Sequence, residues 1–143
     1  MDCNFYKPIY NITADAGIEV EAKTVEDLIC KSVLATVCEM ALPKSANKTV
    51  EKILEVDSLG FPYTFADIIN KVIFLFEVEK FIPLDCSVLQ LTPDGSFVKL
   101  KLVGNRIDGD NFEPRLLIKA ATYHGLEFEK ENGKYKLRVI FDI

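Results

Sequence analysis

Three carboxylate groups near opposite ends of the chain are the groups best suited to chemistry. Asp15 precedes an alternating segment, Asp142 lies at the end of another, and Ile143 carries the terminal carboxylate. If those segments were antiparallel neighbours, the end of one would meet the start of the other. Two negative charges at such a short distance repel each other unless a cation neutralises them. The sequence therefore allows a site for a divalent ion that prefers oxygen, and the donors alone do not choose among Ca²⁺, Mn²⁺ and Mg²⁺.

Each candidate also has a simpler interpretation. Asp15 could close an Asx-turn within residues 11–17, where Gly17 permits a positive φ. Asp142 could be an ordinary exposed charge. His124 is the only histidine, and it could serve as a base beside an acid, but a single histidine on a strand is more often structural.

The four cysteines predict free thiols. They are Cys3, Cys30, Cys38 and Cys86, and no two form a Cys-x-x-Cys pair. Cys30 and Cys38 fall within one predicted helix, too far apart along its axis to bridge each other. A zinc site would need more ligands than one histidine adds. We therefore expect buried thiols in a reducing compartment, the cytoplasm.

The end of the chain reads as a β-hairpin that would position Asp142. Residues 118–128 form the first strand, Asn132-Gly133 suits a tight turn, and residues 135–143 form the second. Alternation places two sets of side chains on opposite faces of the second strand. The apolar set is Tyr135, Leu137, Val139 and Phe141, and the other set is Lys136, Arg138, Ile140 and Asp142.

Further strands are predicted from alternation and turn residues. Pro8 confines the strand at residues 5–10 to an edge or an end. The remaining predicted strands are residues 17–23, 49–56, 84–92 and 96–103. Pro93-Asp94-Gly95 joins the last two as a hairpin, and residues 104–115 read as a polar loop.

Two helices complete the pattern. Thr24 is a predicted N-cap for a helix that Pro43 ends. Asp57-Ser58 predicts a second N-cap, with a helix that continues to about residue 79 and is apolar around much of its circumference. Such a helix is covered on more than one side. The fold class is α+β, with mostly antiparallel sheet layers packed around two helices in the order β-β-α-β-α-β-β-β-β.

The totals set broad limits. The chain has 143 residues, which suits a single domain spanning residues 1–143. Its net charge of −5 disfavours a protein that binds nucleic acid through phosphate contacts. We find no run of about 18 apolar residues for a membrane span, no secretory leader and no phosphate-binding glycine loop.

Several segments resemble the archease family. They are Thr13-Ala14-Asp15-Ala16-Gly17-Ile18, the helix start after Thr24, Lys119-Ala120-Ala121-Thr122-Tyr123-His124 and Val139-Ile140-Phe141-Asp142-Ile143. They occur in order across nearly the whole chain, and the apolar helix ending in Leu75-Phe76-Glu77 also fits. The chain departs from the family at Ile12, where archeases often carry His, which removes an imidazole but leaves the carboxylate at Asp15.

The resemblance implies a non-catalytic protein cofactor of the RtcB-type tRNA-splicing ligase. That ligase joins RNA ends after GTP guanylylates its active-site His with Mn²⁺, and archeases promote guanylylation and multiple turnover. The family's acidic metal site corresponds to Asp15, Asp142 and Ile143, with His124 and Thr13 as possible accessory residues. The implied cofactor is a divalent ion, calcium, manganese or magnesium. The implied partner is the ligase, with tRNA engaged only through it and no membrane involved.

Two other classes of function stay open on the residues alone. A free-standing metal-dependent phosphoesterase would use the same acids with His124 as base. A metal-binding interaction or chaperone-like module would bind partners without doing chemistry.

Overall fold

The computed structural model describes residues 2–10, 15–45 and 47–143. The strands are β1 (Lys7–Ile9), β2 (Asp15–Ala22), β3 (Ala41–Pro43), β4 (Val50–Asp57), β5 (Phe81–Leu91), β6 (Phe97–Arg106), β7 (Phe112–Pro114), β8 (Ala120–Ala121), β9 (Glu127–Glu131) and β10 (Lys134–Asp142). The helices are α1 (Val25–Met40) and α2 (Tyr63–Glu77).

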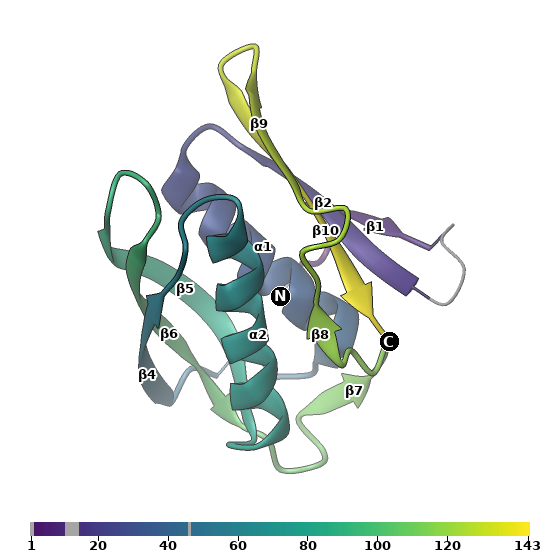
Figure 1. Cartoon of the computed structure of the whole chain (residues 1–143). Coiled ribbons are helices and arrows are strands. Elements are labelled where there is room, and N and C mark those ends of the chain that lie inside the picture. Colours follow the sequence, from purple (N-terminus) through teal and green to yellow (C-terminus); the bar gives the residue numbers. More distant parts are fainter. Residues whose placement is uncertain (1, 11–14, 46) are drawn as a thin grey trace.

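Two antiparallel sheets enclose the two helices (Figure 1). One sheet has the order β1-β2-β10-β8, with β9 also pairing with β10, and the other has the order β4-β6-β5. A short two-stranded sheet joins β3 to β7. Helix α1 contacts β2 and β10 of the first sheet and β5 of the second, while α2 contacts β8, β4 and β5. The predicted α+β class, with antiparallel layers around two helices, is confirmed.

The alternating patterns place the core as predicted. On β10 the side chains of Leu137, Val139 and Phe141 are buried against the helices, and on β2 those of Ile18 and Val20 are buried. Burial of these apolar faces removes them from water, which is the main stabilising contribution to such a fold. Among the described residues, no helix is long and apolar enough to cross a membrane.

Helix α1 begins where the sequence predicts, but it ends earlier. Thr24 caps α1 as predicted, because its hydroxyl accepts a hydrogen bond of 3.1 Å from the Asp27 N–H. The helix ends at Met40 rather than at Pro43. Ala41 is already extended and pairs with Pro114, and the N–H of Arg115 donates to the Met40 carbonyl. Pairing with a distant strand therefore ends the helix early.

The predicted cap of α2 at Asp57-Ser58 is wrong. The helix begins at Tyr63, its N-cap Pro62 makes no side-chain cap bond, and the Thr64 N–H donates to the Gly60 carbonyl. The Ser58 hydroxyl instead donates to the Asp67 carboxylate at 2.6 Å. A polar residue that looks like a cap in sequence is used here for a contact within the first turns of the helix.

The end of the chain differs from a simple hairpin. The predicted strand 118–128 is broken into β8 and β9, with a turn around Gly125, whose φ is +70°. The turn at Asn132-Gly133 is confirmed, since both residues have positive φ, and β10 matches the predicted second strand. The segment 104–115 is not all loop, because β6 extends to Arg106 and Phe112–Pro114 forms β7.

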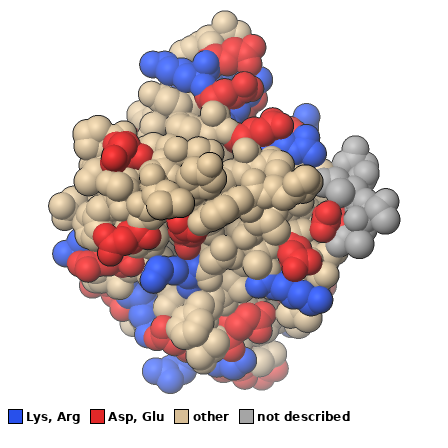
Figure 2. All heavy atoms as spheres, viewed as in Figure 1, with Lys and Arg blue, Asp and Glu red and all other residues tan. Residues whose placement is uncertain are grey.

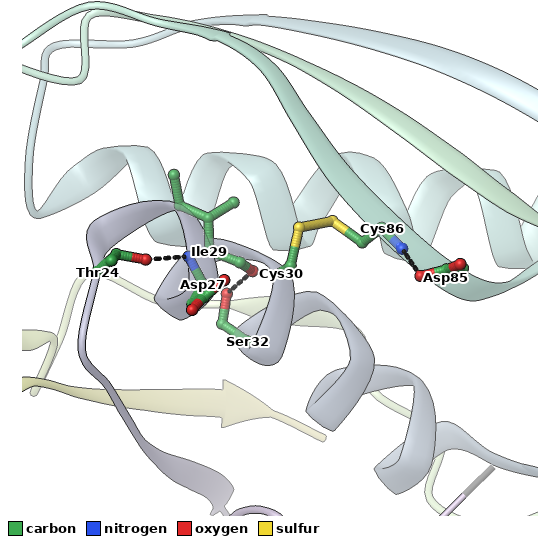
Figure 3. The surroundings of a disulfide bond; sticks show 7 residues. All are labelled: Thr24, Asp27, Ile29, Cys30, Ser32, Asp85 and Cys86. Carbon is green, nitrogen blue, oxygen red and sulfur yellow. Dashed lines mark hydrogen bonds between the residues drawn. A yellow bond between two sulfur atoms is a disulfide. The ribbon is translucent and has the colours of Figure 1, made fainter.

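The prediction of free thiols is also wrong. Cys3 is bonded to Cys38, and Cys30 is bonded to Cys86, with Cα atoms 5.9 and 5.4 Å apart. Cys30 and Cys38 do not bridge each other, as predicted. Figure 3 shows the Cys30–Cys86 bond, which joins α1 to β5 of the second sheet. Spacing along the chain did not reveal these pairs because tertiary packing brings each cysteine to its partner.

Candidate functional site

Asp15 and Asp142 lie directly opposite each other. Strands β2 and β10 are antiparallel, and their register pairs Asp142 with Asp15 at the end of the ladder. Residues directly opposite in such a ladder have Cβ atoms roughly 4.5–5.5 Å apart. Asp15 is half-buried and Asp142 is exposed. The two carboxylates from opposite ends of the sequence therefore meet where two inner strands of the first sheet end, a rim that we call the acid edge.

A close approach of the two strands fixes this edge. Gly17 lies inside β2, and its φ is not positive. It is therefore not the turn residue that the sequence suggested. A Cβ at Gly17 would come 2.5 Å from the Val139 carbonyl oxygen and 3.2 Å from Ile140 Cδ1. Only glycine therefore fits here without displacing β10, and the two acids are held in register by the strands beside them.

His124 lies on the rim of the same edge. A hollow of about 330 Å³ is lined by Asp15, His124, Gly125, Glu127, Arg138 and Ile140. The turn that carries His124 is tied to β10, because the Thr122 N–H donates to the Ile140 carbonyl at 2.9 Å. The fold thus brings His124 close to Asp15, although the histidine is in a turn and not on the predicted strand.

Helix α2 anchors this turn through residues that the sequence analysis missed. The Asn70 side chain donates to the Ala121 carbonyl at 3.1 Å and accepts from the Ala121 N–H at 2.7 Å. The Tyr123 hydroxyl donates to the Asp67 carboxylate at 2.5 Å, and that hydrogen bond raises the pKa of Tyr123. The only sequence signal for these anchors was that Asp67 and Asn70 are polar residues on a helix that is mostly apolar.

The paired acids fit an oxygen-ligated ion with few protein ligands. Two carboxylates opposite each other supply hard oxygen donors, and water completes the shell of such ions. Within the described parts of the chain, no group of three or more His, Cys, Asp or Glu side chains gathers as a metal cage. Ile143 follows Asp142, and its side chain packs against the core. Thr13 and Ile12 lie outside the described residues.

A second polar cluster lies away from this edge. Glu39 on α1 is 2% exposed and accepts hydrogen bonds from the hydroxyls of Tyr6 and, at 3.0 Å, Tyr10. Burial, followed by the adjacent Glu39 carboxylate, raises the pKa of both tyrosines. The hydroxyls satisfy a buried carboxylate that would otherwise be costly, so this cluster stabilises the N-terminal segment against α1.

The fold and the acid pair together define a class of protein. It is a small α+β domain whose first sheet presents paired carboxylates at the ends of two inner strands, with a histidine beside them. The sequence profile of the Archease protein family (MTH1598/TM1083) matches residues 8–143. The chain belongs to the archease family.

Relatives and solved structures agree with this assignment. Protein archease of Pyrococcus furiosus is 26% identical over 136 residues, which cover 94% of this chain and 96% of the relative. Protein archease of Methanopyrus kandleri is 26% identical over 133 residues, with 92% and 94% covered.

Two solved structures share the fold. The solution structure of Methanobacterium thermoautotrophicum protein 1598 superposes with a TM-score of 0.77 at 24% identity, covering 97% of this chain and 99% of that one. The crystal structure of a Thermotoga maritima protein, described as an archease and possible chaperone, gives a TM-score of 0.64 at 24% identity, with 94% of both chains covered.

Proposed function

We propose that this protein is a non-catalytic cofactor of an RtcB-type tRNA-splicing ligase, promoting its guanylylation and its multiple turnover. The observation that carries the proposal is the direct pairing of Asp15 with Asp142 at the ends of two inner strands, in a chain of the archease family. Paired acids at an exposed edge suit a protein that brings charge to a partner's reaction centre. A closed catalytic pocket would instead bury its acids.

In this proposal Asp15, Asp142 and the main-chain oxygens of Ile143 hold a divalent ion, with His124 and Thr13 as accessory groups. The ion, once bound, would offset negative charge that develops on nucleotide phosphates during guanylyl transfer. In the proposal, the residues of this chain would bind the ion and orient its ligands. Gly17 keeps the two strands in register, and the Thr122 hydrogen bond holds the His124 turn beside Asp15.

The proposed partner is the ligase, and tRNA is engaged only through it. The net charge of −5 supports this, because a direct RNA binder would need clustered basic residues. We place the protein in the cytoplasm with the splicing ligase. Disulfides are rare in the cytosol of mesophiles but are found in intracellular proteins of hyperthermophiles, so the two disulfides are compatible with this location.

Single-turnover guanylylation of a purified RtcB-type ligase with Mn²⁺ and GTP tests the proposal. The wild-type chain should accelerate the reaction, and Asp15→Asn or Asp142→Asn should abolish the acceleration while leaving the circular dichroism spectrum unchanged. Asp110→Asn is the matched control, because Asp110 is an exposed acid in a loop outside the site. Acceleration by both site variants at the wild-type rate would refute the role of the acid pair.

Two alternative functions give different results in simple assays. A phosphoesterase would hydrolyse phosphate esters without any ligase. A chaperone, the function suggested in the description of the Thermotoga protein, would suppress aggregation of an unfolding client whether or not Asp142 is present. The proposal would be replaced if the protein did not accelerate a ligase from the same organism and was active as a phosphoesterase or as a chaperone.

A further inference from the structure

Helix α2 carries an exposed stripe on the side turned away from the core. Tyr63, the half-buried Asp67 and Phe74 recur at helical spacing along this stripe, and the C-cap residue Val78 continues it. Phe74 is 54% exposed and Val78 is 60% exposed, although most other apolar side chains of α2 are buried. Figure 2 views the molecule from the side on which α2 lies in front, and most of the surface at the centre of this view is uncharged.

A groove runs between this stripe and strand β4. It has a volume of about 700 Å³ and is lined by Leu54, Asp57, Asp67, Asn70, Lys71, Phe74, Leu75 and Glu79. Strand β4 is the outer strand of the sheet ordered β4-β6-β5, so one wall of the groove is a sheet edge. An apolar floor beside a strand edge is suited to binding a peptide segment of another protein.

The charges around the groove are mainly negative. Asp57 and Asp67 form no ion pair with a basic side chain in the part of the chain that the structure describes, and Asp67 is bonded only by hydroxyls. Glu79 is paired with Lys52 at 3.1 Å, which leaves Lys71 as the basic residue that lines the groove. The groove therefore complements a segment that carries both a large apolar side chain and Lys or Arg.

The groove is linked to the candidate metal site through the turn that carries His124. Asp67 lines the groove and accepts the hydroxyl of Tyr123, which directly precedes His124. Tyr123 also packs edge-on against Tyr63, with ring centroids 4.9 Å apart. A single partner could therefore cover the α2 groove and the acid pair at the same time.

We propose that the α2 groove docks the ligase through a segment that inserts an apolar side chain against Phe74 and Leu54 and places Lys or Arg at Asp57 and Asp67. This inference rests on the proposed function, and it adds the surface that holds the partner. The apolar side chain would supply the binding energy, because buried aromatic anchors dominate interfaces. The two carboxylates would steer the basic segment and set its register.

Equilibrium binding of the purified ligase to the immobilised wild-type chain, by biolayer interferometry, tests the surface. Phe74→Ala should raise the Kd at least tenfold, as expected for an anchor residue. Leu89→Ala is the matched control, because Leu89 is 50% exposed on β5, outside the groove lining. It should bind like wild type. Asp57→Asn should slow association and weaken its dependence on salt.

Guanylylation separates docking from the acid pair. At saturating concentration Phe74→Ala should restore full stimulation, because its acids are intact, whereas Asp142→Asn should not stimulate at any concentration. The role of the groove as the docking site would be refuted if Phe74→Ala bound the ligase as tightly as wild type, or if Leu89→Ala weakened binding equally. Neither result would affect the proposed function. A wild-type chain that neither binds nor stimulates the ligase would overturn both. A wild-type dimer in light scattering that Phe74→Ala dissociates would assign the groove to a second copy of this chain, and would also overturn the inference.

Discussion

Reduction of the two disulfides should remove a large part of the stability of this protein. Cys30–Cys86 spans a sequence separation of 56 residues, and Cys3–Cys38 spans 35. The chain-entropy relation gives about 4 kcal/mol for each closed loop of that size, because a cross-link restricts the unfolded chain. Domains are stable by about 5–15 kcal/mol in total, so either bond would be a substantial fraction of the free energy of unfolding.

The two contributions should not add in full. The loop closed by Cys3–Cys38 overlaps the loop closed by Cys30–Cys86 between residues 30 and 38. The second cross-link therefore restricts a chain that the first has already restricted. We expect reduction of both bonds to cost less than the sum of the two paired Cys→Ser variants, and a double-mutant cycle over the two pairs measures the difference.

Urea denaturation followed by far-ultraviolet circular dichroism is the assay, with and without a phosphine reductant. A loss of about 4 kcal/mol should lower the midpoint by roughly 2 M urea. The variant with Cys30→Ser and Cys86→Ser should lose that amount under oxidising conditions. Mass spectrometry after alkylation of the protein unfolded in urea without reductant should find no free thiols, since Cys38 is buried in the folded protein. Four alkylated cysteines in the unreduced protein, or a midpoint insensitive to reductant, would refute the reasoning.

Two further perturbations test the packing directly. Gly17→Ala should destabilise the fold by about 1–3 kcal/mol, because the added Cβ would lie 2.5 Å from the Val139 carbonyl oxygen. The midpoint of urea denaturation measures this loss, with Glu21→Ala as an exposed control in the same strand. Equal midpoints for the two variants would contradict the prediction. Tyr6 is a tyrosine whose pKa is raised by burial and then by Glu39, so its stabilisation is present below pH 10 and is lost as the pH rises further, because the unfolded chain releases the proton first. Tyr6→Phe should therefore flatten the fall in urea midpoint between pH 10 and 12, and an unchanged slope would exclude this group as its cause.

Much of the fold could be predicted because its signals are local. Alternation predicted β2 and β10, Thr24 predicted the start of α1, and Asn132-Gly133 predicted its turn. The predictions failed where distant residues decide the outcome. Pairing of Ala41 with Pro114 ended α1 early, and the anchoring of the Thr122–Gly125 turn broke the strand predicted over residues 118–128.

The residues of the candidate site were also predicted where the signal is local and missed where it depends on distant contacts. The sequence supplied the acids Asp15 and Asp142, and it predicted that they would meet if their strands were antiparallel neighbours. The metal itself and its ligand set remain predictions. The hydrogen bonds by which Asn70 and Asp67 hold the His124 turn were not predicted, because the polarity of these two residues on a mostly apolar helix does not reveal their partners.

By itself, the sequence determined most of the longer strands and the two helices, the class of fold and the identity of the paired acids, because hydrophobic periodicity and turn chemistry act over a few residues. Only the tertiary structure decided the register that places Asp15 opposite Asp142, the partners of the four cysteines and the exposed groove between α2 and β4. Each of these depends on packing between segments that are distant in the sequence, and such contacts leave no regular pattern along the chain.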